Sequence, residues 1–273
     1  MAMNISYVTV DGRRIAVEVR GDGPLVICSP AMGDARSAYT PLADRLIARG
    51  FRVALVDLRG HGDSDTGFAE YGDEATADDL LAVIDELADG PVYLAGASMS
   101  AASVVIAAGR RPDAVAGLIL LAPFLRNGAG AAAQLGMRML LARPWGPAVW
   151  RLYAATLWPG LGKAGARARA AETSRLLARP GRWAAFAATA RTDHAVVAPW
   201  LSKVTAPSLV VMGDADPDWK DPGAEADWVA SQLGSEILLV PGVGHAPMLE
   251  EPDVVSSRIA DFLTGVRHAT RRA

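Results

Sequence analysis

Two kinds of hydrophobic pattern occur along the chain. Near its start, Ile5–Val10 and Arg14–Arg20 alternate apolar and polar residues, and Asp11-Gly12 between them is a two-residue hairpin signal. Later runs are short and dense in Val, Leu and Ile, as expected for strands buried on both faces of a parallel sheet. These runs are Pro24–Ser29, Arg52–Asp57, Val92–Ala95, Val115–Leu121, Ser208–Met212 and Glu236–Val240.

Helical periodicity lies between the predicted strands. Ala38–Arg49 and Thr76–Ala88 repeat apolar residues at helical spacing, and Ala101–Arg110 and Asp253–Leu263 are further helices. Strands that alternate with helices predict crossover units in a parallel sheet. Because an antiparallel hairpin leads into it, we expect a mixed, mostly parallel sheet of about eight strands with helices on its faces.

The alternation stops between Phe124 and Trp200. This stretch holds five of the seven tryptophans, many alanines and no convincing strand. From Arg126 to Trp200, ten Arg and one Lys face only two acidic residues, a surplus of nine positive charges. We therefore expect a helical cap at residues 125–200, inserted into a core of residues 1–124 and 201–273. The surplus Arg is interpreted as a solvated face, a membrane-surface patch or an attraction for anionic substrates.

Composition excludes several classes of protein. The net charge of −3 gives no indication of nucleic-acid binding, and the one cysteine, Cys28, excludes an internal disulfide framework. No Cys/His spacing suggests a zinc site. We expect no metal and no organic cofactor. Residues 1–11 lack the features of a signal peptide, and no run reaches the length of a membrane span. A cytoplasmic location fits, although a disulfide-free secreted protein would look the same.

Ser98 is the candidate nucleophile. It follows the predicted strand Val92–Ala95 and precedes an apolar helix, in a sequence with Gly96 and Ser100 two residues to either side. A strained strand-to-helix turn exposes such a serine above the sheet edge and requires small neighbours. The alternative is a serine that merely caps the helix. Ser64, which lies among aspartates with no apolar helix after it, is interpreted as a loop or capping residue.

His245 is the candidate base, since a serine hydroxyl needs a neighbouring base at neutral pH. Of the four histidines, only His245 lies in a loop directly after a late buried strand, at the edge where such sheets bind ligands. Asp214, Asp216 and Asp218 crowd the end of the preceding strand and could orient the imidazole. Solvated-turn and helix-capping roles are the alternative for these aspartates.

With these motifs, the chain resembles the α/β-hydrolase superfamily, near its esterases, lipases and cofactor-free haloperoxidases. The order Ser98, Asp216, His245 matches the family's Ser…Asp…His order, and its Gly-x-x-Asp turn selects Asp216 over Asp214. Asp57–Ser64 resembles the loop after the family's fourth strand. The resemblance covers residues ~4–124 and ~201–265 and implies an α/β-hydrolase fold with a catalytic triad.

The resemblance also implies an oxyanion hole, built from the backbone N–H groups of Met32 and Met99. Two departures from the family pattern accompany it. Ser100 replaces the last motif glycine, and Pro30-Ala31 replaces His-Gly before the oxyanion donor. Because the donor is a backbone group, the change of side chain need not remove it.

Some residues of the expected cap should line a substrate pocket, although most must pack within the cap itself. The candidates for substrate binding are Met137, Trp145, Trp150, Trp183 and His194. Apolar lining favours an apolar acyl or alcohol group. For His194 the alternative is simple surface exposure.

The expected function is a serine hydrolase that cleaves a carboxylic ester, thioester or lactone of a small to medium apolar substrate through an acyl-enzyme. An acyltransferase or a perhydrolase would use the same acyl-enzyme with another acceptor. A non-catalytic ligand receptor on the same fold is the third possibility. The partner expected is a small molecule, with no nucleic acid and no integral membrane segment; the oligomeric state stays open.

Overall fold

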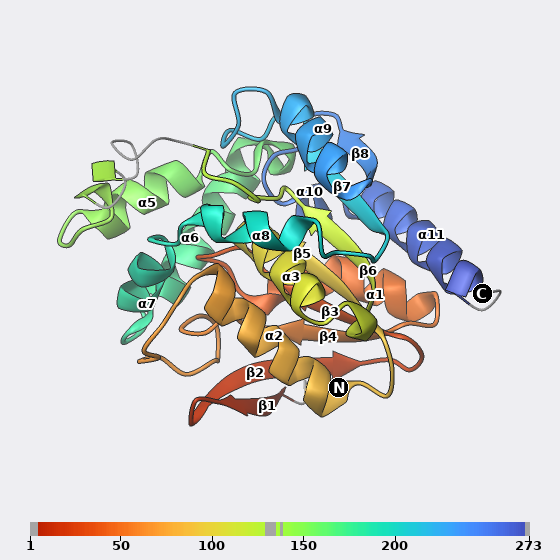
Figure 1. Cartoon of the computed structure of the whole chain (residues 1–273). Coiled ribbons are helices and arrows are strands. Elements are labelled where there is room, and N and C mark those ends of the chain that lie inside the picture. The colour runs from red at the N-terminus through yellow and green to blue at the C-terminus, as the bar shows by residue number, and fades with distance from the viewer. Residues whose placement is uncertain (1–4, 129–134, 137–138, 271–273) are drawn as a thin grey trace.

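The strands form one mixed sheet, seen in a computed structural model that describes residues 5–128, 135–136 and 139–270. Eight strands lie in the order β1-β2-β4-β3-β5-β6-β7-β8, with β1/β2 and β2/β4 antiparallel and the other pairs parallel (Figure 1). They are β1 (Ile5–Val10), β2 (Arg13–Arg20), β3 (Leu25–Ser29), β4 (Arg52–Val56), β5 (Val92–Ala97), β6 (Val115–Leu121), β7 (Ser208–Gly213) and β8 (Glu236–Val240). The mostly parallel eight-stranded sheet predicted from the sequence is confirmed.

The first hairpin follows from its turn residues. Asp11 and Gly12 both have positive φ, 52° and 73°. Two-residue hairpin turns with the twist of the flanking strands need positive φ at both positions, which Asp-Gly supplies at low steric cost. The hairpin therefore begins the sheet as an antiparallel pair, with Val10 opposite Arg13.

Helices cover both faces of the sheet. On one face, α1 (Thr40–Ala48) and α11 (Pro252–Thr270) bury Leu42 and Ile259 against the strands. On the other face lie α2 (Asp73–Leu87), α3 (Met99–Arg110) and α9 (Pro222–Leu233), which also bury apolar side chains against the strands. This three-layer arrangement buries the apolar side chains that the strands present on both faces of the sheet. Among the described residues, no helix is both long enough and apolar enough to cross a membrane.

The strand β8 departs from the expectation of burial on both faces. Ile237 and Leu239 are 38% and 44% exposed. The reason is the position of β8, which pairs only with β7 and forms one edge of the sheet. An apolar run in the sequence does not distinguish an edge strand from an interior strand.

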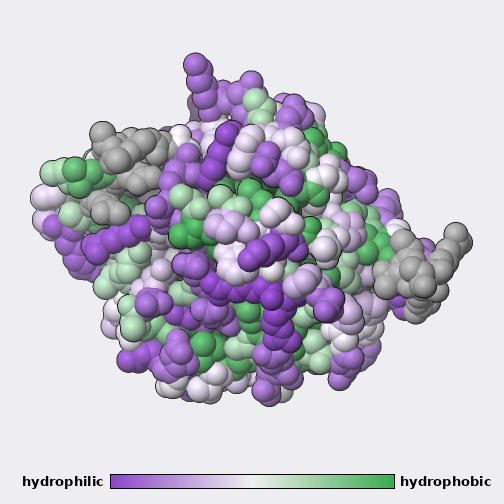
Figure 2. Space-filling model, viewed as in Figure 1, coloured by the Kyte–Doolittle hydropathy of each residue, from purple (hydrophilic) through white to green (hydrophobic). Residues whose placement is uncertain are grey.

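The described residues between β6 and β7 form helices and connecting loops, and no strand is found among them. Its helices are α5 (Gly146–Ala154), α6 (Gly162–Leu177), α7 (Arg182–Thr189) and α8 (Ala198–Leu201), with short 3-10 helices at Pro159–Leu161 and His194–Val197. Figure 1 shows α5, α6 and α7 grouped to one side of the sheet. We call residues 139–201 the inserted helices. Exposed apolar side chains are frequent in and just before their first part, and Figure 2 shows green surface there.

Candidate active site

A cavity of about 370 Å³ lies between the sheet and the inserted helices. Loops after β3, β5, β7 and β8 contribute Met32, Ser98, Asp218 and His245 to its wall. The inserted helices and the loops beside them contribute mainly large apolar groups, namely Leu141, Trp150, Tyr153, Leu157 and Trp158. The cavity therefore lies at the carboxyl ends of the parallel strands, where open α/β sheets bind ligands.

Ser98 occupies a strained turn between β5 and α3. Its φ of 56° and ψ of −123° lie in a region that side chains other than glycine rarely adopt. Gly96 is required beside it, because a Cβ there would lie 2.3 Å from the carbonyl oxygen of Ser100. The turn places Ser98 at the cavity wall, and Met99 begins α3 with an N–H that the helix leaves without an acceptor.

Ser100 connects this turn to the loop that carries Met32. Its hydroxyl is fully buried, donates to the carbonyl oxygen of Pro30 (2.6 Å) and accepts from the hydroxyl of Ser29 (3.0 Å). Sequence reasoning treated Ser100 only as a small residue that replaces glycine. The available signal was the pairing of this departure with Pro30-Ala31, because the Ser100 hydroxyl binds the backbone of that altered loop.

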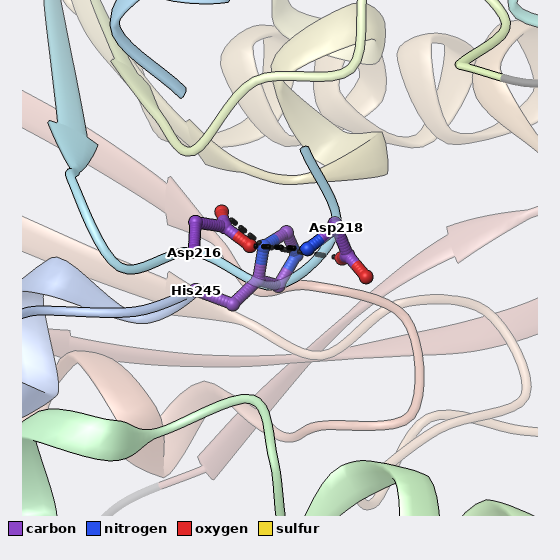
Figure 3. A group of neighbouring side chains, drawn as sticks. All are labelled: Asp216, Asp218 and His245. Atoms are coloured by element: carbon purple, nitrogen blue, oxygen red, sulfur yellow. Dashed lines mark hydrogen bonds and ion pairs between the residues drawn. The ribbon is translucent and has the colours of Figure 1, made fainter. Parts of the chain in front are cut away.

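His245 faces two carboxylates. Its Nδ1 lies 2.8 Å from Asp216 Oδ2 and 3.3 Å from Asp218 Oδ2 (Figure 3). Burial lowers the pKa of His245, but the negative charges of Asp216 and Asp218 together raise it by more, to about 9. The two carboxylates therefore hold the imidazole at its Nδ1 edge, while Ser98 lines the same cavity. Among the described residues, no hydrogen bond joins Ser98 Oγ to His245.

The three aspartates after β7 have separate roles. Asp216 is buried, accepts the Asp218 N–H through Oδ1 (3.0 Å) and faces His245 through Oδ2. Asp218 accepts a hydrogen bond from the Tyr153 hydroxyl, which belongs to α5. Asp214 is exposed and accepts from the Gly242 N–H (2.6 Å) instead. Sequence reasoning did not assign Asp218 to the site, because nothing in its spacing separates it from a turn residue.

The same cluster has the donor types of a cation site. One ligand atom from each of Asp216, Asp218 and His245 lies within 4.8 Å of the others. Carboxylates and imidazole are common ligands of divalent cations. The imidazole Nδ1 already forms a hydrogen bond with Asp216, so an ion bound at Nδ1 would replace that hydrogen bond.

The proposed substrate-binding residues divide into three groups. Trp150 and His194 line the cavity, and Trp150 is buried with its ring 4.6 Å from that of Phe186. Trp145 and Trp183 do not line it, which corrects the expectation from sequence. Trp145 is 54% exposed, and Trp183 is buried against Phe186 inside the helical packing. Met137 lies outside the described residues.

Other wall residues were not singled out from the sequence. Phe124 packs its ring against those of His245 (5.9 Å) and Trp219 (4.6 Å). Asp34 lines the cavity beside Met32 and forms a buried ion pair with Arg169 of α6. No local pattern marks such residues, because they come together only when the inserted helices pack on the sheet.

Comparison with known proteins places this geometry in a family. The sequence profile of the alpha/beta hydrolase family matches residues 25–258. The chain is 30% identical over 264 residues to the 2-(acetamidomethylene)succinate hydrolase of Mesorhizobium japonicum, covering 93% of this chain and 94% of that one. A thermophilic esterase from Thermogutta terrifontis, described with malate bound, superposes with a TM-score of 0.82 at 25% identity, covering 96% and 99%. An enol-lactonase from Burkholderia xenovorans shares the fold, with a TM-score of 0.82 at 20% identity over 95% and 100% of the two chains.

Proposed function

Because this chain belongs to the alpha/beta hydrolase family, we propose that it is a serine hydrolase that cleaves a carboxylic ester, thioester or lactone through an acyl-enzyme on Ser98. One observation carries the proposal. Ser98, held in a strained turn, lines the same cavity as His245, whose Nδ1 faces the buried Asp216. These are the three roles that nucleophilic catalysis by serine requires.

In the proposed mechanism, Ser98 Oγ attacks the substrate carbonyl carbon while His245 takes the hydroxyl proton. Asp216 holds the ring orientation and stabilises the imidazolium that forms. The N–H groups of Met32 and Met99 stabilise the oxyanion of the tetrahedral intermediate. When the intermediate collapses, His245 gives the proton to the leaving alkoxide or thiolate. Water then attacks the acyl-enzyme while His245 takes one of its protons, and that proton passes to Ser98 Oγ as the acid is released.

The inserted helices act in this proposal as a cap that selects the substrate. We place the cap at residues 125–200, and its aromatic wall favours an apolar acyl or alcohol group. The relative from Mesorhizobium japonicum is named for an acetamido derivative of succinate. Because of that name, amides should be tested as well as esters, thioesters and lactones. Compounds that carry a carboxylate should be included among the substrates tested. The proposal also includes a cytoplasmic location, which agrees with a single buried, unpaired cysteine, Cys28.

Covalent labelling with a fluorophosphonate, with mass spectrometry of the labelled peptide, tests the nucleophile. We expect one label, on Ser98, and loss of hydrolysis of 4-nitrophenyl esters in proportion to labelling. EDTA should change neither labelling nor turnover, because the triad supplies the nucleophile, the base and the electrostatic stabilisation. A label on another serine, or activity that EDTA removes and Zn²⁺ restores, would contradict the proposal.

Analysis of the products distinguishes the related readings. A free carboxylic acid indicates hydrolysis, whereas a new ester or amide in the presence of an alcohol or amine indicates acyl transfer. A peracid in the presence of peroxide indicates perhydrolysis. A non-catalytic receptor would bind ligands in this cavity with neither labelling of Ser98 nor turnover of any ester in a panel of varied chain length and charge.

A further inference from the structure

A cation without a counter-ion lies on the cavity wall. Arg191 lines the cavity in the segment between α7 and the 3-10 helix His194–Val197. Across the described residues, its guanidinium makes no hydrogen bond, ion pair or aromatic contact, whereas its backbone N–H donates to Ala188. The segments 129–134 and 137–138, which lie outside the described residues, contain no Asp or Glu in their sequence. The positive charge of Arg191 is thus available to a ligand.

This position sets Arg191 apart from the other basic residues of the insertion. Arg169 and Arg179 form ion pairs with acidic residues of the core, and Arg182 donates to backbone carbonyls. Arg151 and Arg167 form no ion pair with any described residue and are exposed like Arg191, but neither lines the cavity. Of these basic residues, Arg191 is therefore the one that lines the cavity without an ion pair to a described residue.

Two further polar groups lie beside Arg191 on the wall. The Thr192 hydroxyl accepts from the Asp73 N–H (3.1 Å) and keeps its own proton to donate. His194 Nδ1 lies 2.8 Å from Asp73 Oδ2. Asp73 is buried, does not line the cavity and so does not compete with a ligand for Arg191. The stretch 191–194 therefore presents one cation, one hydroxyl donor and one imidazole to the same ligand.

The acidic residues on the wall are already engaged. Asp34 pairs with Arg169 and accepts the Ala35 N–H (2.7 Å). Asp218 accepts from Tyr153 and faces His245. Neither carboxylate therefore needs Arg191 as a partner, and the charge of Arg191 remains for a substrate anion.

The position of Arg191, Thr192 and His194 relative to His245 indicates what kind of ligand they would bind. The Phe124 ring lies 5.6 Å from the His194 ring and 5.9 Å from the His245 ring, so one aromatic ring separates the two histidines. We propose that Arg191, with Thr192 and His194, binds a carboxylate of the substrate, several bonds from the carbonyl that Ser98 attacks. This inference rests on the proposed function and makes the preferred substrates anionic acyl compounds. Arg suits this role because its planar guanidinium binds carboxylates in a bidentate manner.

A matched pair of esters tests the subsite. Mono(4-nitrophenyl) glutarate and 4-nitrophenyl pentanoate share a leaving group and a five-carbon acyl chain and differ in the terminal carboxylate. We expect the wild-type protein to prefer the glutarate ester, and Arg191→Gln to reduce the ratio of the two kcat/KM values about tenfold, mainly through KM for glutarate. Arg167→Gln is the matched control, because it removes an exposed cation outside the cavity, and it should leave the ratio unchanged.

Two charge variants sharpen the test. Arg191→Lys keeps the charge without the planar guanidinium and should restore part of the preference, whereas Arg191→Glu should reverse it in favour of the neutral ester. Added salt should reduce the wild-type preference, because it screens a partly exposed charge pair. A ratio that is the same in wild type, Arg191→Gln and Arg191→Glu would overturn the subsite.

Failure of the proposed function would be visible separately. If neither ester is hydrolysed and Ser98 is not labelled by fluorophosphonate, the hydrolase proposal fails, but calorimetric titration with glutarate still tests the subsite. Binding of glutarate to the wild type and Arg167→Gln, with loss in Arg191→Gln, would support it without turnover. Equal binding by all three proteins, or by none, would overturn it.

Discussion

The two walls of the cavity are built on different principles. On the sheet side, Ser98, Asp216 and His245 each lie a few residues after a strand, and Asp216 and His245 are joined by a hydrogen bond. On the inserted side, Trp150, Tyr153 and Trp158 supply ring surfaces from α5 and the loop after it. Backbone geometry fixes the first wall, whereas side-chain size and charge define the second. In the proposed function, the sheet side carries the bond chemistry and the insertion selects the substrate.

The walls are nevertheless connected at a few polar contacts. The backbone N–H of His245 donates to the carbonyl oxygen of Leu157 (2.8 Å), which follows α5. Glu250 accepts N–H groups of Gly244 and Ala246 in the His245 loop and also that of Gly160 in the insertion. Packing of the inserted helices therefore helps to hold the loop that carries His245.

The largest expected effect is on the sheet side. Ser98→Ala should reduce kcat for 4-nitrophenyl esters by about 10⁴-fold or more, because binding and the oxyanion donors alone remain. Ser103→Ala is the matched control: Ser103 is a buried serine of α3 whose hydroxyl has no partner among the described residues. Steady-state kinetics of both variants check this. Activity that survives in Ser98→Ala would place the chemistry elsewhere.

The second effect separates the two aspartates. Asp216→Asn should lower kcat/KM by about 10²- to 10⁴-fold, because the imidazole loses its orienting acceptor. At pH 9 and above, where the pKa of His245 matters least, Asp218→Asn should cost about tenfold or less, because Asp218 lies farther from Nδ1 and is shared with Tyr153. Equal losses in the two variants would mean that both carboxylates hold the ring.

The pH profile follows from the same pair. The pKa of His245 is raised to about 9, so the neutral base is scarce at pH 7 and kcat/KM of the wild type should rise with pH until about 9. Removing the Asp218 charge lowers that pKa, so the rise in Asp218→Asn should be complete at a lower pH. Rates measured from pH 6 to 10 check the shift, and an unmoved profile would exclude Asp218 as a cause of the raised pKa.

A smaller effect is expected where the serine turn meets the Met32 loop. Ser100→Ala removes the hydroxyl that binds Pro30 and Ser29, and leaves two buried polar groups without this partner. We expect a loss of about 1–3 kcal/mol in the free energy of unfolding and a decrease of about tenfold in kcat. Denaturant unfolding and steady-state kinetics measure the two, with Ser103→Ala again as control. A stability loss without any change in kcat would leave Ser100 a purely structural residue.

The smallest effect tests the inserted wall. Each further methylene of the acyl chain should raise kcat/KM by nearly fourfold, about 0.8 kcal/mol, until the cavity is full. Trp150→Phe should move the optimum to longer chains by enlarging the cavity. Trp145→Phe should not, because Trp145 is exposed and lies off the cavity wall. A 4-nitrophenyl ester series from C2 to C8 gives the answer, and a flat series would refute an apolar pocket.

The sheet and its loops could be predicted because their signals are local. Val115–Leu121 and Glu236–Val240 have the same bounds as β6 and β8, since a run of Val, Leu and Ile marks a strand directly. Ser98 and His245 could be selected in the same way, because each follows such a run at short distance. The order of these residues along the chain then matched a known family pattern.

The other wall could not be predicted because its signals are not local. Trp145, Trp150 and Trp183 are equivalent in the sequence, yet one is exposed, one lines the cavity and one lies inside the helical packing. Likewise, ten Arg of one segment gave a surplus of charge without showing that Arg191 would meet the cavity unpaired.

The sequence by itself thus determined the order of strands and helices, the nucleophile and base to be tested, and the segment that interrupts the sheet. Only the tertiary structure decided that Asp218 and Tyr153 join Asp216 at His245, that Ser100 binds the Met32 loop, and which side chains of the insertion face the cavity. The physical reason is how far apart along the chain the interacting residues lie. Hydrophobic periodicity and turn strain act between residues a few positions apart, whereas a cavity wall forms between residues that only the packing of distant elements brings into contact.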